Sequence, residues 1–196
     1  MQELSMHVLD IAQNSVAAGA TRIEISVRID TAARRLVLTI ADNGKGMSEE
    51  VRQRVTDPFY TTRTTRKVGL GLPFFAQAAK AAQGSLNITS APGKGTSVVA
   101  DFQLGHIDLA PLGDMDGTIV GLIQCNPALD FSYNVWADGQ TFCMDTRELR
   151  EQLVQAQGAV KRQLLRGGTP QQYQAWQQQA DAIEAGFKQV LPDATY

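Results

Sequence analysis

The segment Asp42–Met47, with the sequence Asp-Asn-Gly-Lys-Gly-Met, most constrains the fold of this chain. It follows a β-like run, Leu36–Ile40, and precedes an acidic helix start. A carboxylate at the end of a strand can accept hydrogen bonds from an exocyclic amine such as that of adenine. Gly44 and Gly46 let the backbone approach a flat ring and permit positive φ. Asn-Gly is also an ordinary turn sequence, so the segment alone leaves a turn and a pocket floor open.

Composition narrows the class of protein. The 196 residues, 43% hydrophobic and 19% charged, suit one globular domain or two small ones. A net charge of −2 gives no general attraction to nucleic acid or acidic membranes. No apolar run reaches the ~18 residues that span a bilayer, and no signal-peptide pattern opens the chain, so we expect a cytoplasmic protein. Cys125 and Cys143 are expected to be reduced thiols packed in apolar surroundings.

Periodicity predicts alternating helices and strands in the first half of the chain. Apolar residues recur at helical spacing from 3 to 17, and every second residue from Arg22 to Ile29 is apolar. The stretch 56–68 is irregular, basic and rich in Thr and Arg. The remaining expected elements are a strand at 36–41, helices at 49–55 and 70–83, and strands at 85–89 and 96–104.

The character of the sequence changes near Gly105. We expect a domain at 1–104, a linker at 105–113 and a small α-β-β-α domain with a C-terminal helix at 114–196. Asp114 can cap the first of these helices, and Asp138-Gly139 is a strong hairpin signal between strands 131–136 and 140–144. Helices are expected at 147–165 and 170–190, the second with an apolar stripe of Trp176, Ile183, Phe187 and Val190.

Two polar side chains interrupt the first helix. Asp10 and Asn14 lie one turn apart on one face, with His7 roughly one turn before them. The amide oxygen of Asn14 is a suitable hard ligand for Mg²⁺. Asp10 could orient a water molecule or accept a proton. A solvated polar face is the alternative interpretation, because surface faces of helices are normally polar.

The loop from Asp57 to Leu72 combines hydroxyls, cations and glycines. Gly69 and Gly71 stand at an expected helix start, whose free N–H groups suit phosphates. Arg63, Arg66 and Lys67 can neutralise phosphate charge. An exposed basic loop is the alternative, and the sequence contains no P-loop motif.

These motifs, followed by Gly95-Thr96, occur in an order and spacing that resemble the GHKL ATPase superfamily of gyrase, Hsp90, histidine kinases and MutL. The resemblance covers residues 1–104 and implies the Bergerat fold, an α+β two-layer sandwich, here with a small C-terminal α/β appendage. The first motif is similar to MutL, and the loop with Gly69-Leu70-Gly71-Leu72 is similar to sensor histidine kinases. The chain as a whole is closest to stand-alone histidine-kinase-like ATPase domain proteins.

The resemblance implies a role for each matching residue. Asp42 recognises the adenine amine with help from Thr96, Asn14 ligates Mg²⁺, and Gly69 and Gly71 hold phosphates beneath a lid at 61–68. Asp10 stands where many relatives carry a glutamate base and is one methylene shorter. The candidate residues are Asp10 for catalysis and Asn14, Asp42, Gly44, Gly46, Met47, Thr61, Thr62, Arg63, Lys67, Gly69, Leu70, Gly71, Leu72 and Thr96 for Mg·ATP.

The expected function is therefore a Mg·ATP-binding, histidine-kinase-like ATPase that acts on a partner protein in trans. The chain starts close to the asparagine helix, so we expect no phosphoacceptor domain of its own, and we expect neither His7 nor His106 to accept a phosphoryl group. Two alternatives stay open: a MutL- or gyrase-type clamp that closes as a homodimer, and a non-hydrolysing ATP sensor or anti-sigma-like binding protein.

The partner is not identified by the sequence. A fainter resemblance, to stand-alone proteins that accompany iron hydrogenase subunits, implies association with a hydrogenase or redox system. The lack of a basic face argues against nucleic acid as the partner.

Overall fold

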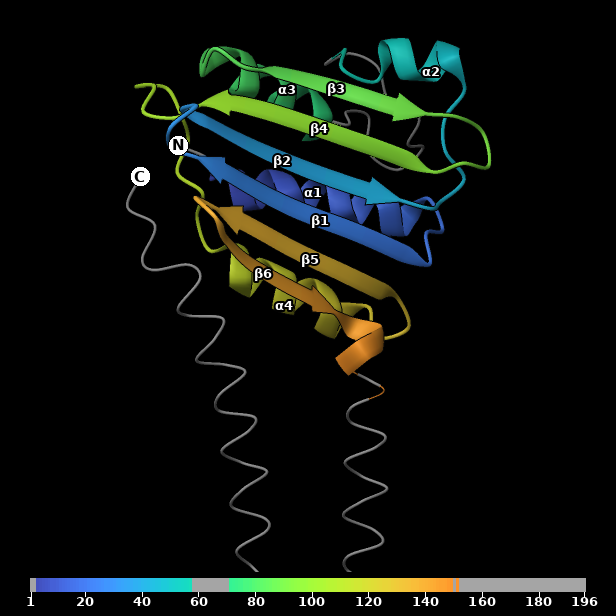
Figure 1. Ribbon diagram of the computed structural model, residues 1–196. Coiled ribbons are helices and arrows are strands. Elements are labelled where there is room, and N and C mark those ends of the chain that lie inside the picture. The colour runs from blue at the N-terminus through green and yellow to red at the C-terminus, as the bar shows by residue number, and fades with distance from the viewer. Residues whose placement is uncertain (1–2, 58–70, 150, 152–196) are drawn as a thin grey trace, which may run out of the picture.

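The computed structural model describes residues 3–57, 71–149 and 151. Ten labelled helices and strands, followed by a helical segment that starts at Thr146, make up this part of the chain (Figure 1). Their bounds are α1 Leu4–Ala17, β1 Arg22–Asp30, β2 Arg35–Asp42, α2 Glu49–Arg54, α3 Gly71–Ala81, β3 Ser85–Ser90, β4 Thr96–Gln103, α4 Met115–Cys125, β5 Asp130–Ala137 and β6 Gln140–Asp145. Each lies within two residues of the element expected from the sequence, because strong periodicity sets element type.

The strands form one sheet in the order β3-β4-β2-β1-β5-β6. β1 and β2 form an antiparallel hairpin in which Ile25 faces Ile40, and β4 pairs antiparallel with β2. β5 lies parallel to β1, with Tyr133 beside Ile25, and the Asp138-Gly139 turn leads into β6. A parallel pair needs a crossover connection, which α4 supplies.

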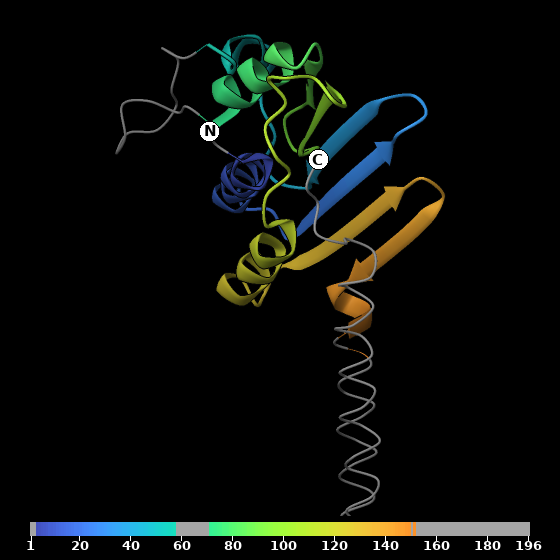
Figure 2. The same cartoon turned by 90° about the vertical axis from the view of Figure 1, so that its left-hand side faces the viewer.

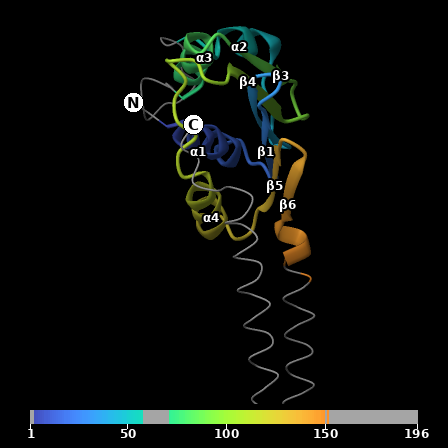
Figure 3. The ribbon, with the colours of Figure 1, turned by 60° about the vertical axis from the view of Figure 1, so that its left-hand side comes forward.

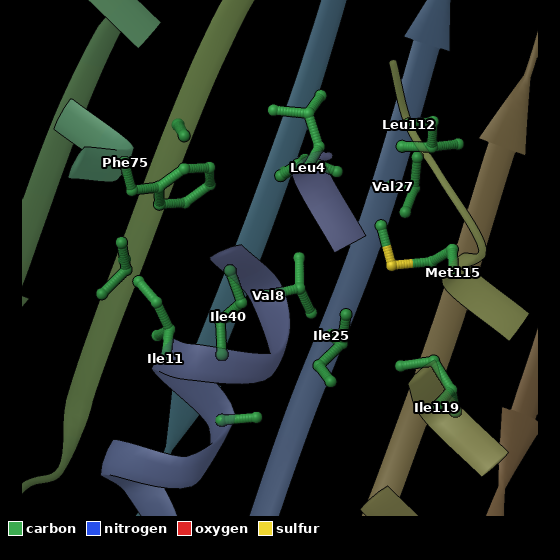
Figure 4. Close-up of a cluster of buried hydrophobic side chains, with 14 of the residues drawn as sticks. Leu4, Val8, Ile11, Ile25, Val27, Ile40, Phe75, Leu112, Met115 and Ile119 are labelled. Carbon is green, nitrogen blue, oxygen red and sulfur yellow. The ribbon is translucent and has the colours of Figure 1, made fainter. Parts of the chain in front are cut away.

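The helices α1, α3 and α4 lie against one face of this sheet (Figures 2 and 3). Alternate residues of the strands point toward them, as the buried and partly exposed positions of β1 and β2 show. Figure 4 shows the resulting core, in which Val8 and Ile11 of α1 meet Ile25 and Ile40 of the sheet. The expected α+β two-layer architecture is confirmed.

Segments beyond residue 104 are packed against the same core. Met115, Ile119 and Leu122 of α4 are buried together with Phe131 and Tyr133 of β5. In the segment 105–113, Ala110 and Leu112 are buried, and the carbonyls of Pro111 and Leu112 accept the N–H groups of Leu4 and Ser5, each at 2.9 Å. The appendage therefore extends the first sheet; its division into a linker and a separately folding domain stays a prediction.

The prediction of packed cysteines is wrong. Cys125 and Cys143 are both free thiols and both exposed. Cys125 is the last residue of α4. Cys143 lies on β6 opposite Asn134 of β5, and its side chain is on the face of the strand away from the core. Helix ends and outward positions of a strand are partly solvated even when their sequence neighbours are apolar. Among the residues described, no helix is long and apolar enough to span a bilayer.

Asp116, in the first turn of α4, is predicted to make stability depend on pH. Burial, and then the charge of Asp114, raise the pKa of Asp116 to about 6, and its Oδ1 has no hydrogen-bond partner in the described residues. A carboxyl group whose pKa is raised on folding costs stability as the pH rises through the folded pKa. Asp116 is only partly buried, so solvent screens part of this effect. We therefore expect ionisation of Asp116 to cost about 1 kcal/mol of stability.

Asp116→Asn should therefore raise the free energy of unfolding by about 1 kcal/mol more at pH 8 than at pH 4. Urea unfolding at the two pH values measures this difference. Glu50→Gln, an exposed carboxylate of α2, is the matched control and should show no such difference. An Asp116→Asn effect that is the same at both pH values would contradict the prediction.

Candidate functional site

The carboxylate of Asp42, the last residue of β2, is held from two sides. Its Oδ2 accepts a hydrogen bond from the Ser15 hydroxyl of α1 at 2.6 Å. Its Oδ1 accepts the backbone N–H of Gly44 at 2.8 Å and that of Thr96 at 3.3 Å. Three donors from three separate segments fix the orientation of this side chain, as a recognition group requires.

Thr96 and Met47 lie near Asp42 and are linked to each other by the Ser90 hydroxyl. Asp42 and Thr96 are paired residues of β2 and β4. The hydroxyls of Thr96 and Ser90 lie 3.0 Å apart, and Ser90 accepts the backbone N–H of Met47 at 2.9 Å. The structure thus brings three of the residues predicted from the sequence to one end of the sheet.

The glycines of the motif are required by packing between loops. Gly46 has a φ of +65°, and a Cβ built there would lie 2.0 Å from the carbonyl oxygen of Ala91. Gly95 has a φ of +78°, and its Cβ would lie 1.9 Å from the carbonyl oxygen of Asp42. Both positions combine left-handed backbone with a contact that only glycine fits. Contact of Gly44 and Gly46 with a bound ring stays a prediction.

Asn43, between the carboxylate and the glycines, anchors the start of β1. Its Oδ1 accepts the N–H groups of Thr21 and Arg22, each at 2.9 Å, and its Nδ2 donates to the Thr21 hydroxyl at 2.8 Å. This bridge ties the end of β2 to the loop after α1. Asp42 is therefore positioned relative to α1 by a side chain that the sequence pattern alone did not single out.

The second end of the site lies where α1 meets the start of α3. A Cβ on Gly71 would lie 3.2 Å from Cβ of Asp10 and 3.7 Å from its Oδ2. The described part of α3 starts at Gly71 and has no acidic residue in its first turn, and the N–H groups in the first turn of a helix suit an anion. Asn14 lies between the two ends, half-buried on α1 and next to Ser15 in the sequence.

Helix α1 links the two ends. Ser15 contacts Asp42 at one end, and Asp10, five residues earlier, contacts the start of α3 at the other. Five residues correspond to a rise of about 7.5 Å along the helix. Asp10 and Asn14, at positions i and i+4, share one face of α1, and a ligand with a base at one end and an anionic group at the other could follow this face.

Six predicted residues lie outside the described part of the chain: Thr61, Thr62, Arg63, Lys67, Gly69 and Leu70. Leu72 is half-buried and packs against the core, so its part in a ligand site stays a prediction. Sequence reasoning missed Ser15 and Ser90 as members of the site. Ser15 is 3% exposed on an otherwise apolar stripe, and a hydroxyl at such a position signals a polar partner across the core.

The residues present fit a magnesium ion that arrives with a nucleotide. No group of three or more His, Cys, Asp or Glu residues that could hold a metal occurs in the described ranges. Mg²⁺ is commonly bound through one or two protein oxygens together with substrate phosphates and waters. Asn14, half-buried on α1 between Asp10 and Ser15 in the sequence, carries the amide oxygen that suits this arrangement.

Comparison with known proteins identifies the family. The family model of histidine kinase-, DNA gyrase B- and HSP90-like ATPases matches residues 2–106, more than half of the chain. The chain belongs to this family, the GHKL superfamily that the motifs predicted. A second model, the cytoplasmic E component of the type III secretion needle, matches residues 143–190.

The curated relatives include sensor kinases. A sensor protein of Shewanella frigidimarina is 38% identical over 110 residues, which are 55% of this chain and 17% of that protein. Sensor protein kinase FleS of Pseudomonas aeruginosa is 37% identical over 105 residues, 54% of this chain and 25% of FleS. Sporulation kinase C of Bacillus subtilis is 30% identical over 94 residues, 48% and 22% of the two chains. The match thus spans about a quarter or less of these relatives.

Proposed function

We propose that this histidine-kinase-like ATPase domain binds Mg·ATP along α1 and signals to a partner protein in trans. The observation that carries the proposal is the Asp42 carboxylate, held by Ser15, Gly44 and Thr96 within the residues that the family model matches. A carboxylate so fixed can accept the exocyclic amine of adenine and discriminate it from a carbonyl group.

Each residue of the site has a role in this proposal. Asp42 accepts the adenine amine, and Thr96 supports it through the backbone N–H that donates to Oδ1. Asn14 supplies an oxygen to Mg²⁺, which neutralises phosphate charge. The free N–H groups at the start of α3 receive the phosphates beside Asp10, which accepts a proton from the attacking water. The expected lid at 61–68 lies outside the described residues.

We propose that the phosphoryl acceptor, where one is used, belongs to the partner. Of the two histidines in the sequence, His7 is 3% exposed and stacked on Phe75. His106 Nδ1 accepts the backbone N–H of Asp108 at 3.2 Å in the turn after β4. The burial of one ring and the turn contact of the other support an acceptor elsewhere.

A non-hydrolysing ATP sensor is the second candidate, and the length of Asp10 favours it. An aspartate reaches one methylene less far than the glutamate of many relatives. Steady-state phosphate release from the wild type, compared with Asp10→Asn, separates the two functions. Release above the uncatalysed rate that Asp10→Asn abolishes supports the ATPase, and release at the uncatalysed rate by both supports the sensor.

Calorimetric titration of Mg·ATP into wild type and Asn14→Ala tests the binding proposal. Loss of an oxygen ligand to a cation should weaken Mg·ATP binding about ten- to a hundredfold and remove its dependence on Mg²⁺. Gln13→Ala, an exposed neighbour on α1, is the matched control and should bind like wild type. Equal affinity and equal Mg²⁺ dependence of wild type and Asn14→Ala would overturn the proposal. Incubation with γ-labelled ATP and candidate partners then tests phosphoryl transfer.

A further inference from the structure

The face of the sheet opposite the helices carries a hollow of about 920 Å³. Helices α1, α3 and α4 lie on one side of the sheet (Figures 2 and 3), and in the described part of the chain none of them covers the other side of β2, β1, β5 and β6. These four strands and their two hairpin turns line the hollow. Three strand spacings, about 14 Å, separate β2 from β6, which is enough for one helix of about 10 Å diameter.

One row of paired residues crosses the floor of the hollow, one from each strand: Val37 of β2, Arg28 of β1, Trp136 of β5 and Thr141 of β6. The residue before each of Val37, Arg28 and Trp136 is buried in the core, so these three side chains point away from it. Trp136 is 39% exposed. Trp and Arg are among the residues that most often carry the binding energy of an interface. An indole beside a cation on an uncovered sheet face therefore indicates a docking surface.

Charges of both signs lie in the hollow at a fixed separation. Arg28 makes no ion pair within the described ranges. Asp30, two residues further along β1, lines the same hollow, and its Oδ1 accepts the N–H of Ala33 at 2.7 Å. The carboxylate of Asp138 is used in the turns, where it accepts the N–H of Thr31 at 2.9 Å. Residues two apart on a strand share a face and lie about 6.6 Å apart, so a complementary segment must present the opposite pair of charges at that separation.

The C-terminal part of this chain carries a segment of complementary pattern. Residues 183–190 have the sequence Ile-Glu-Ala-Gly-Phe-Lys-Gln-Val and lie outside the described ranges. In the helix expected there, Ile183 and Phe187 share one face. Glu184 and Lys188 lie beside that face, one turn and about 6 Å apart along the axis. The segment therefore combines an apolar face with a carboxylate and a cation at the separation that the hollow requires.

The chain between β6 and this segment is long enough to return it to the hollow. β6 borders the hollow and ends at Asp145. The helices expected at 147–165 and 170–190 would each be about 30 Å long. Gly167-Gly168 between them permits a reversal of the chain. A second helix as long as the first then brings its C-terminal end back to the level of the sheet.

We propose that residues 183–190 dock on the uncovered face of the sheet and fill the hollow. The apolar face of the segment packs on Trp136 and Val37, and its two charges pair with Arg28 and Asp30. The contact is intramolecular, because the chain that forms the hollow also supplies its occupant. It makes the C-terminal segment part of the same folded unit as the sheet.

Acrylamide quenching of Trp136 fluorescence tests the contact in the full chain. The sequence has two tryptophans, and Trp176→Phe leaves Trp136 as the reporter. In this background Phe187→Asp should raise the quenching constant about threefold, because a docked segment shields an indole that is otherwise 39% exposed. Gln189→Asp, on the other face of the expected helix, is the matched control and should leave the constant unchanged. An unchanged constant in Phe187→Asp, or an equal rise in Gln189→Asp, would overturn the proposal.

A charge exchange tests the pairing and separates it from misfolding of a variant. Arg28→Glu places like charges opposite each other and should also raise the quenching constant of Trp136. Acrylamide is uncharged, so this substitution neither attracts nor repels the quencher. Glu184→Arg in the same chain restores opposite charges and should return the constant toward its starting value. A double variant as strongly quenched as Arg28→Glu alone would contradict the proposal. A constant that rises when the unsubstituted protein is diluted would place a second copy in the hollow and would likewise contradict it.

Discussion

Asp42→Asn should weaken ATP binding about a hundredfold. Two backbone N–H groups, of Gly44 and Thr96, point at Oδ1, so the amide oxygen of asparagine must take that position. The amide NH₂ then takes the place of Oδ2, where it faces the Ser15 hydroxyl and, in the proposed complex, the amine of adenine. When two hydrogen-bond donors face each other in a half-buried site, both are left without an acceptor. This costs about 3 kcal/mol, which corresponds to about a hundredfold in affinity.

The same geometry predicts a change of base preference. Inosine carries a carbonyl oxygen where adenine carries its amine, and the new NH₂ can donate to it. The ratio of ATP to ITP affinity, measured by calorimetry, should therefore fall in Asp42→Asn. Ser15→Ala is the matched control, because it removes one donor to Asp42 but leaves both carboxylate oxygens: it should weaken ATP binding less and keep the preference for ATP. An unchanged ratio in Asp42→Asn would show that Asp42 does not contact the base.

Gly84→Ala should be the most destabilising single-methyl change among the described glycines outside the candidate site. Gly84 connects α3 to β3, and a Cβ built there would lie 1.8 Å from the carbonyl oxygen of Asp101 and 3.0 Å from Cα of Phe102. Both are backbone atoms of β4, which pairs with β3 at Ser85 and Asp101. The methyl group can be accommodated only by moving β3 off its partner, and we expect a loss of about 3 kcal/mol.

Gly121→Ala makes the same chemical change with the opposite expected sign. Gly121 lies inside α4, and nothing lies within 4 Å of a Cβ built there. Replacing a helical glycine by alanine should raise the free energy of unfolding by about 1 kcal/mol. Urea unfolding measures the free energy of unfolding of both variants. The two values can be compared when the slope of this free energy against urea concentration is the same for both. A Gly84→Ala variant as stable as wild type would show that β3 and β4 are not joined as described.

The elements and the family were predictable because each rests on a local pattern. The alternation of Ile23, Ile25 and Val27 marks a half-buried strand, and the Asp138-Gly139 pair marks a hairpin. The structure contains both. The exposed cysteines were predicted wrongly because apolar neighbours in sequence do not decide whether a position on a helix end or a strand faces outward.

The sequence by itself determined the type and order of the helices and strands, the glycine-rich motif after β2 and membership of the GHKL family, since each depends on residues that are close together or regularly spaced. Only the tertiary structure decided that β5 runs parallel to β1 in the same sheet, and that Ser15, 27 residues from Asp42, holds its carboxylate. It also placed His7 against Phe75. Single contacts between distant segments follow no period, because packing of the whole core selects them.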